Sequence, residues 1–164
     1  MRRTLVWRGL DAPRLEIAYV VLDDGGLRGR GTQIGTEPEP YELRYEVGAD
    51  RLALDIVGGA HADLRLEGAD FFDLAFSPLL NSFPIMRDGL HGGGEARDYT
   101  MTFVDVPSLA SEPAEQRYEP LRPGVVRFRA GSFVADLELD DDAFVVRYPG
   151  LAELVGPRSA GPGR

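Results

Sequence analysis

Strict alternation of apolar and charged residues is the feature of this sequence that most constrains its fold. The segment 41–47, YELRYEV, places four apolar side chains on one side and three charged side chains on the other. A period of two residues is that of a β-strand, whose successive side chains point to opposite faces. The pattern predicts further strands at residues 14–22, 51–57, 62–68, 99–106, 125–130, 133–140 and 143–149. Strands with one apolar and one charged face are typical of antiparallel sheets with one side in water.

Helical patterns are weak beside these strands. Short helical turns are expected from Ser108 up to Pro113 and at residues 151–154. Many strands and few helices leave a sandwich, a barrel or one strongly curled sheet as the architecture. The length of 164 residues suits one domain with a substantial core. We place that domain at residues 1–155 and predict that the Gly/Pro-rich residues 156–164 are disordered.

Composition excludes several classes of function. The chain has neither cysteine nor lysine, which rules out disulfides, iron–sulfur clusters and Schiff-base chemistry. The formal charge of -9 argues against nucleic acid as a partner, because its recognition needs clustered positive charge. The apolar run Leu5–Trp7 is too short for a signal peptide, and no run is long enough to cross a bilayer. We therefore expect a cytoplasmic protein without a transmembrane segment.

Three motif-like strings are better explained as strands and turns. In GRGTQIG (residues 29–35) the third glycine comes one residue late for a dinucleotide fingerprint, and prolines replace the helix that should follow. HGGG (residues 91–94) matches a lipase oxyanion-hole string, but no serine has the G-x-S-x-G spacing. Asp140–Asp142 lack the ligand spacing of a calcium loop and are expected in a β-turn. We expect no cofactor, no metal and no catalytic residue from these strings.

One apolar stretch fits neither period. Residues 76–90, FSPLLNSFPIMRDGL, contain Pro78 and Pro84, which fix φ and remove two backbone donors. We expect irregular backbone laid over the apolar face of the curled sheet, with Arg87 at its rim. The side chains expected to face the hollow are those of Leu79, Leu80, Phe83 and Ile85. Two interpretations stay open: the stretch plugs the hollow as part of the core, or it covers a vacant cavity.

The same stretch belongs to a larger set of motifs. Residues 73–87 fit the form D-L-x-x-[ST]-P-x-x-N-[ST]-x-P-I-x-R, and Gln116-Arg117-Tyr118 and an acidic turn followed by Tyr148-Pro149 come later. In these motifs, over about 150 residues, the chain resembles the putative glycolipid-binding family of bacterial proteins. It departs from the family at Ala69, where a cysteine is usual, and at Leu79-Leu80, which replace a Thr-Asn step.

The resemblance implies a fold and a function. The implied fold is a single curled antiparallel sheet forming a spiralled β-roll with few short helical turns. The implied function is non-enzymatic binding of a small amphipathic molecule, a glycolipid or another lipid, in the hollow of the roll. The expected ligand-binding residues are Trp7, Asp73, Ser77, Asn81, Phe83, Arg87, Arg117 and Tyr118. Tyr41 and Tyr45 are further candidates for stacking on a sugar ring.

Other functions stay open at this point. The chain would be an enzyme acting on a sugar or lipid if carboxylates such as Asp70 and Asp73 faced one pocket. It would be a protein-interaction module if a strand edge or an apolar patch were exposed. Arg117 would be structural instead of ligand-binding if its guanidinium forked a carboxylate on a neighbouring strand.

Overall fold

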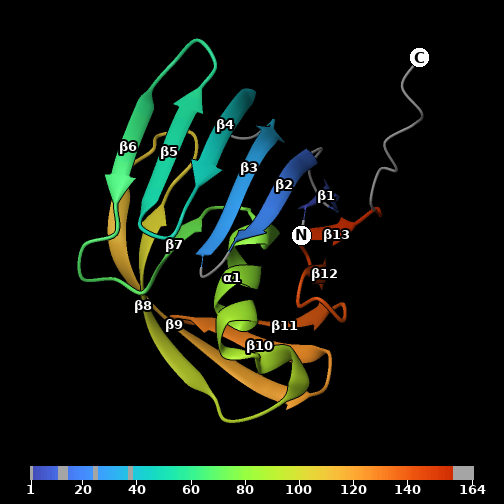
Figure 1. The fold of residues 1–164 in the computed structure, drawn as a ribbon. Coiled ribbons are helices and arrows are strands. Elements are labelled where there is room, and N and C mark those ends of the chain that lie inside the picture. The colour runs from blue at the N-terminus through green and yellow to red at the C-terminus, as the bar shows by residue number, and fades with distance from the viewer. Residues whose placement is uncertain (1, 11–14, 24–25, 37–38, 157–164) are drawn as a thin grey trace.

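The computed structural model describes residues 2–10, 15–23, 26–36 and 39–156, and within them the chain is mainly β (Figure 1). The strands before the helix are β1 (Arg2–Gly9), β2 (Leu15–Asp23), β3 (Gly26–Gly35), β4 (Tyr41–Val47), β5 (Arg51–Ile56), β6 (His61–Arg65) and β7 (Phe71–Leu74). The later elements are α1 (Pro78–Asp88), the 3-10 helix η1 (Leu90–Gly92), β8 (Arg97–Val104), β9 (Ser111–Arg122), β10 (Val125–Ala130), β11 (Phe133–Leu139), β12 (Val145–Tyr148) and β13 (Ala152–Leu154). Of the tail predicted to be disordered, residues 156–164, all but Gly156 lie outside the described ones.

Hydrogen bonds join the described strands in the order β6-β5-β4-β3-β2-β1-β13-β12-β11-β10-β9-β8-β7. The sheet curls so that its two halves enclose α1 (Figure 1). The pair β7–β8 is parallel, with Phe71 opposite Met101 and Leu74 opposite Val104, so the prediction of a purely antiparallel sheet was wrong. The reason is the helix: two adjacent parallel strands need a crossover connection, and α1 lies between β7 and β8 in the chain.

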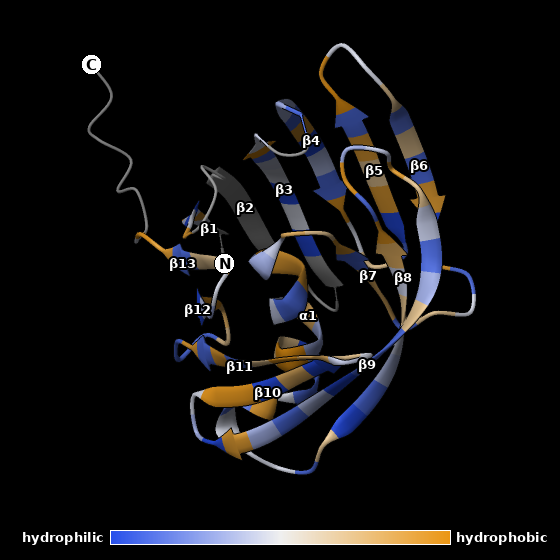
Figure 2. Ribbon diagram, turned by 180° about the vertical axis from the view of Figure 1, so that it is seen from behind, coloured by the Kyte–Doolittle hydropathy of each residue, from blue (hydrophilic) through white to orange (hydrophobic). Residues whose placement is uncertain are grey.

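The alternating segments are strands, as predicted. β4 and β10 begin and end at the predicted residues, and β11 ends one residue early. Along β4 the four apolar side chains are buried and the charged ones are partly or fully exposed. Figure 2 shows the same alternation as bands of apolar and polar residues along β4, β5 and β6. The apolar face points into the curl, so the period of the sequence sets which side of the sheet becomes the core.

Glycines of β3 make room for two buried tyrosines of β4. Gly31 pairs with Tyr45, and Gly35 pairs with Tyr41. A Cβ atom at Gly31 would lie 2.3 Å from Tyr45 Cζ, and one at Gly35 would lie 2.2 Å from Tyr41 Cε1. The glycine-rich string 29–35 is therefore a strand whose missing side chains are replaced by aromatic rings from its neighbour.

The stretch expected to be irregular is an α-helix, and that prediction was wrong. Pro78 lies in the first turn, where a missing N–H costs nothing, and Gly89 ends the helix with φ of 66°. Pro84 removes one internal hydrogen bond, yet every residue from Pro78 to Ile85 is buried. Burial on all sides stabilises a helix far more than local propensity does. The expected inward position of Leu79, Leu80, Phe83 and Ile85 is confirmed.

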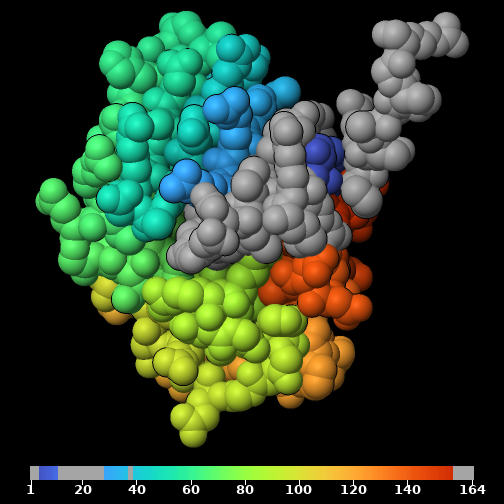
Figure 3. Space-filling model, viewed as in Figure 1, coloured from blue at the N-terminus to red at the C-terminus, as the bar shows by residue number. Residues whose placement is uncertain are grey.

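One side-chain contact fastens this helix to β12, and a second fastens β1 to the same residue of β12. Ser82 Oγ accepts the Val145 N–H at 3.0 Å and donates to the Pro78 carbonyl at 3.1 Å. The Val145 carbonyl accepts the indole N–H of Trp7 at 2.6 Å. In the space-filling view the yellow-green residues of the α1 region lie directly against the red-orange residues of the β12 region (Figure 3). Neither helix in the described part of the chain is long and apolar enough to span a membrane.

Two further local predictions need correction, and two hold. The helical turns expected at 108–113 and 151–154 are overturned at residues 111–113 and 152–154, which belong to strands β9 and β13 and pair with neighbouring strands. The turn at Gly131 has the expected positive φ, 58°. Asp140 lies in a turn, as predicted, and its Oδ1 accepts the backbone N–H groups of Asp142 and Phe144.

Candidate functional site

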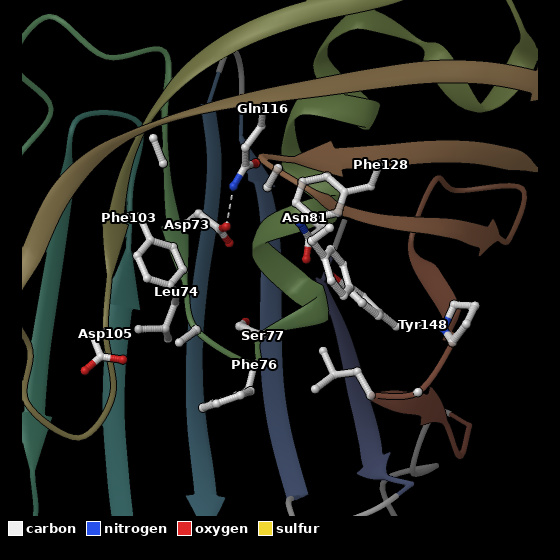
Figure 4. Close-up of a pocket in the computed structure, with 17 residues that line it drawn as sticks. Asp73, Leu74, Phe76, Ser77, Asn81, Phe103, Asp105, Gln116, Phe128 and Tyr148 are labelled. Atoms are coloured by element: carbon white, nitrogen blue, oxygen red, sulfur yellow. Dashed lines mark hydrogen bonds between the residues drawn. The ribbon is translucent and has the colours of Figure 1, made fainter.

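A pocket of about 530 Å³ remains inside the curl, beside the first turn of α1 (Figure 4). One wall is the chain running from the end of β7 into the helix, and the other is the inner face of β8 to β12. The first wall contributes Asp73, Leu74, Ala75, Phe76, Ser77 and Asn81. The second wall, with its adjoining turns, contributes Phe103, Asp105, Ala114, Gln116, Phe128, Ala130, Phe133, Tyr148, Pro149, Gly150 and Leu151.

Burial divides this lining into a floor and a mouth. The floor consists of the buried members with polar or aromatic side chains: Asp73, Ser77, Asn81, Gln116, Phe128 and Tyr148. The mouth consists of the exposed members: Phe76, Asp105, Phe133, Pro149 and Gly150. Phe133 is 48% exposed and Phe76 is 36% exposed, so large apolar side chains flank the opening. A ligand would therefore meet two phenyl rings and the Asp105 carboxylate at the opening before the buried polar groups of the floor.

A chain of hydrogen bonds crosses the floor. Gln116 Nε2 donates to Asp73 Oδ2 at 2.5 Å, and Gln116 Oε1 accepts the Tyr118 hydroxyl at 3.1 Å. The same hydroxyl accepts from Asn81 Nδ2 at 3.0 Å. β7, β9 and α1 are thereby tied together through four buried polar side chains. Such a network holds its members in fixed positions, because any unsatisfied buried polar group is costly.

Burial also shifts the ionisation of these groups. Removal from water raises the pKa of the Asp73 carboxyl to about 6, although hydrogen bonds from Gln116 and the Leu74 N–H oppose this. Burial likewise raises the pKa of the Tyr118 hydroxyl well above its usual range, and the negative charge of Asp73 adds to the effect. The pKa of Tyr148 is raised for the same two reasons. A carboxyl whose pKa approaches neutrality inside a pocket is a common mark of a functional site.

Three aromatic rings form one side of the pocket. Phe128, Phe133 and Tyr148 contact one another pairwise, with ring centroids 6.1 to 6.4 Å apart. The Phe133 and Tyr148 rings are stacked, and the other two pairs meet edge to face. The faces of such rings suit the apolar face of a sugar or an aliphatic chain.

The structure brings three of the eight predicted binding residues together in this pocket: Asp73, Ser77 and Asn81. Tyr118 lies directly behind them in the hydrogen-bond chain. Trp7 and Phe83 belong to the hydrophobic core, and neither is among the described residues that line the pocket. Tyr41 and Tyr45, the further stacking candidates, are buried against the glycines of β3.

The two predicted arginines lie elsewhere. Arg117 points outward from β9, and its Nη1 donates to both carboxylate oxygens of Asp98 on β8 at 2.8 and 3.0 Å, a pairing with a carboxylate on a neighbouring strand as in the structural alternative. Arg87 stacks its guanidinium over the Phe71 ring, 4.2 Å from the centroid, and pairs with Asp88. The geometry of β9 and α1 directs both side chains away from the pocket, and neither belongs to its lining.

Sequence reasoning missed most of the second wall. Gln116 was part of a quoted motif but was not selected, although its spacing of two from Tyr118 places both on the inner face of β9. Phe103, Phe128, Phe133 and Tyr148 come from four strands whose order in the sheet the sequence did not reveal. The alternation predicted strands at these residues but did not show that they are neighbours in one pocket.

The carboxylates considered for catalysis do not meet. Asp70 is exposed and accepts the Thr100 N–H, whereas Asp73 is buried in the floor. Within the described residues no group of three or more His, Cys, Asp or Glu side chains is arranged to hold a metal ion. The polar groups of the floor are instead donors and acceptors suited to hydroxyl groups.

Comparison with known proteins places the chain. The model of the family described as "Putative glycolipid-binding" matches residues 56–153, more than half of the sequence. A DUF1089 family protein from Pseudomonas aeruginosa, known from its crystal structure, has a similar fold with a TM-score of 0.65 and 22% identity. The alignment covers 88% of this chain and 93% of that protein. No curated protein matches the sequence. The resemblance seen in the motifs is thus confirmed, and the chain belongs to the putative glycolipid-binding family.

Proposed function

We propose that the protein is a non-enzymatic carrier that binds a small amphipathic molecule of the glycolipid class inside a spiralled β-roll. The observation that supports this most is the pocket beside α1, which combines a buried polar floor with an aromatic wall and mouth. Its volume of about 530 Å³ lies within the range of about 300–1,000 Å³ usual for small-molecule sites. The family description agrees with this class of ligand.

The arrangement of the lining suggests how the ligand lies. The polar headgroup would reach the floor, where Asp73, Asn81 and Gln116 can bond to its hydroxyls. The Phe128–Phe133–Tyr148 side would contact the apolar face of a sugar ring or the first carbons of a chain. Each buried methylene contributes about 0.8 kcal/mol. The rest of the chain would pass Phe76 and Phe133 at the mouth.

The sequence allows the apolar stretch 76–90 to be interpreted either as a plug that completes the core or as a cover over a vacant cavity. Both descriptions apply, to different parts of the stretch. Helix α1 fills part of the hollow, because its buried apolar side chains belong to the hydrophobic core. The pocket is the part of the hollow that the first turn of the helix does not fill. The helix is thus both core and one wall of the site, which restricts the ligand to the space beside Ser77 and Asn81.

Native mass spectrometry of protein purified from its own cells tests the proposal. We expect a bound species whose mass is that of a small amphipathic molecule. We also expect the recombinant protein to bind octyl glucoside below its critical micelle concentration. Ala114→Phe, which fills the pocket from β9, should abolish both, whereas Ala53→Phe on the outer face of β5 should not. Absence of bound species and of glycoside binding, or equal binding by the Ala114→Phe protein, would contradict the proposal.

A further inference from the structure

The pocket contains negative charge without any compensating cation among the described residues. Its lining has two carboxylates, Asp73 in the floor and Asp105 at the mouth, and no arginine or histidine of the described chain contributes to it. Lysine is absent from the whole sequence. Sites that bind phosphate, sulfate or carboxylate headgroups usually present arginine forks or lysines to them.

Strand alternation explains why cations are missing here. On β9 the inward Gln116 is followed by the outward Arg117, which is paired with Asp98. On β10 the inward Phe128 is flanked by Arg127, paired with Asp136, and by the exposed Arg129. Because neighbouring residues of a strand point to opposite faces, these arginines cannot reach the pocket without a shift of register.

The start of α1, which lines the pocket, favours an anion. A helix N-terminus carries roughly half a positive charge. Here Pro78 occupies the first turn and offers no N–H, and no acidic side chain in that turn uses the dipole. When both are ionised, the carboxylates of Asp73 and Asp105 outweigh that half charge, so the electrostatic potential in the pocket is negative.

On these grounds we infer that the pocket selects an uncharged, hydroxyl-bearing headgroup and excludes anionic ones such as phosphate, sulfate or free carboxylate. The inference rests on the proposed function and adds the chemical class of the headgroup. The side chains that would contact the headgroup are amides, a hydroxyl and one carboxyl, which can donate to and accept from sugar hydroxyls. A cationic headgroup is less suitable, because burying an ammonium group beside Asp73 has a desolvation cost that a neutral hydroxyl avoids.

A set of eight-carbon amphiphiles separates these possibilities at pH 8, where Asp73 is ionised. Octyl glucoside, octyl sulfate, octyl phosphate and octylamine share one tail and differ in headgroup charge. Isothermal titration calorimetry below their micelle concentrations should show octyl glucoside binding at least about tenfold more tightly than either anion. Asp73→Asn should raise the affinity for both anions at least about tenfold, since a like charge a few ångströms away is removed.

Matched variants complete the test. Asp55→Asn makes the same change of net charge on the exposed face of β5 and should leave all affinities unchanged. Asp105→Asn, at the exposed mouth, should raise anion affinity about two- to threefold, and it keeps the inference testable if Asp73→Asn fails to fold. Anions or octylamine binding as tightly as the glucoside would overturn the inference but leave the proposed function standing. Failure of every amphiphile to bind would overturn both.

Discussion

Replacing Asp73 by asparagine should stabilise the protein, and the gain should grow with pH. The side chain is 8% exposed and accepts one hydrogen bond from Gln116. An asparagine side-chain oxygen can accept the same bond without a charge. The substitution therefore removes the ionisation of a buried carboxyl while keeping its size and its main contact.

The expected magnitude follows from the pKa of the carboxyl in the two states. In the unfolded chain the pKa is about 3.9. In the folded protein burial raises it to about 6. Because the pKa of Asp73 is higher in the folded protein than in the unfolded chain, raising the pH ionises the unfolded chain first and so favours unfolding. Relative to the protonated carboxyl, no stability is lost below about pH 4, and the loss is nearly complete once the pH has risen through 6. At pH 8 the loss amounts to about 3 kcal/mol, and at pH 5 to about half of that.

Urea unfolding at pH 5, 6, 7 and 8, followed by the fluorescence of the single tryptophan, measures this difference. Trp7 is buried and bonded to β12, so its emission should report unfolding. Asp73→Asn should exceed the wild type by about 3 kcal/mol at pH 8 and by about 1.5 kcal/mol at pH 5. Asp55→Asn serves as the exposed control and should show no such trend. A variant less stable than the wild type at pH 8, or a gain independent of pH, would show that burial does not disfavour the Asp73 carboxylate.

The remaining predictions concern packing, the network and one arginine. Gly31→Ala should lower the free energy of unfolding by about 1–3 kcal/mol, because its methyl group would collide with the Tyr45 ring; urea unfolding checks this. Tyr118→Phe should cost about 1–3 kcal/mol, since two buried amide side chains lose their shared hydroxyl, and it should weaken octyl glucoside binding in calorimetry. Arg87→Gln should cost about 0.5–1 kcal/mol through the lost stacking on Phe71 and leave octyl glucoside affinity unchanged, which separates it from the pocket residues.

Part of the candidate site was predictable from the sequence and part was not. Asp73, Ser77 and Asn81 belong to one motif within nine residues, and the end of β7 together with the start of α1 places all three in the pocket wall. Arg87 comes from the same motif, but the last turn of the helix carries it to the Phe71 ring instead. A motif thus indicates which residues are near in the chain, and only the backbone conformation decides which of them share a cavity.

Helix α1 illustrates why the local sequence pattern is insufficient to predict secondary structure. Two prolines argue against regular structure, and the expectation of an irregular segment followed from them. In the folded chain Pro78 falls where no N–H is needed, and burial of eight successive residues compensates for Pro84. The parallel pairing of β7 and β8 follows from that helix, so the two errors have one cause.

The sequence by itself determined that the alternating segments form strands and which side of those strands faces the core. These properties are local, because side-chain direction alternates with every residue and burial follows the apolar set. The tertiary structure alone decided the strand order, the helix inside the curl and the pocket at its start. These depend on contacts between residues far apart in the chain, such as Gln116 with Asp73 and Ser82 with Val145, whose geometry no single segment encodes.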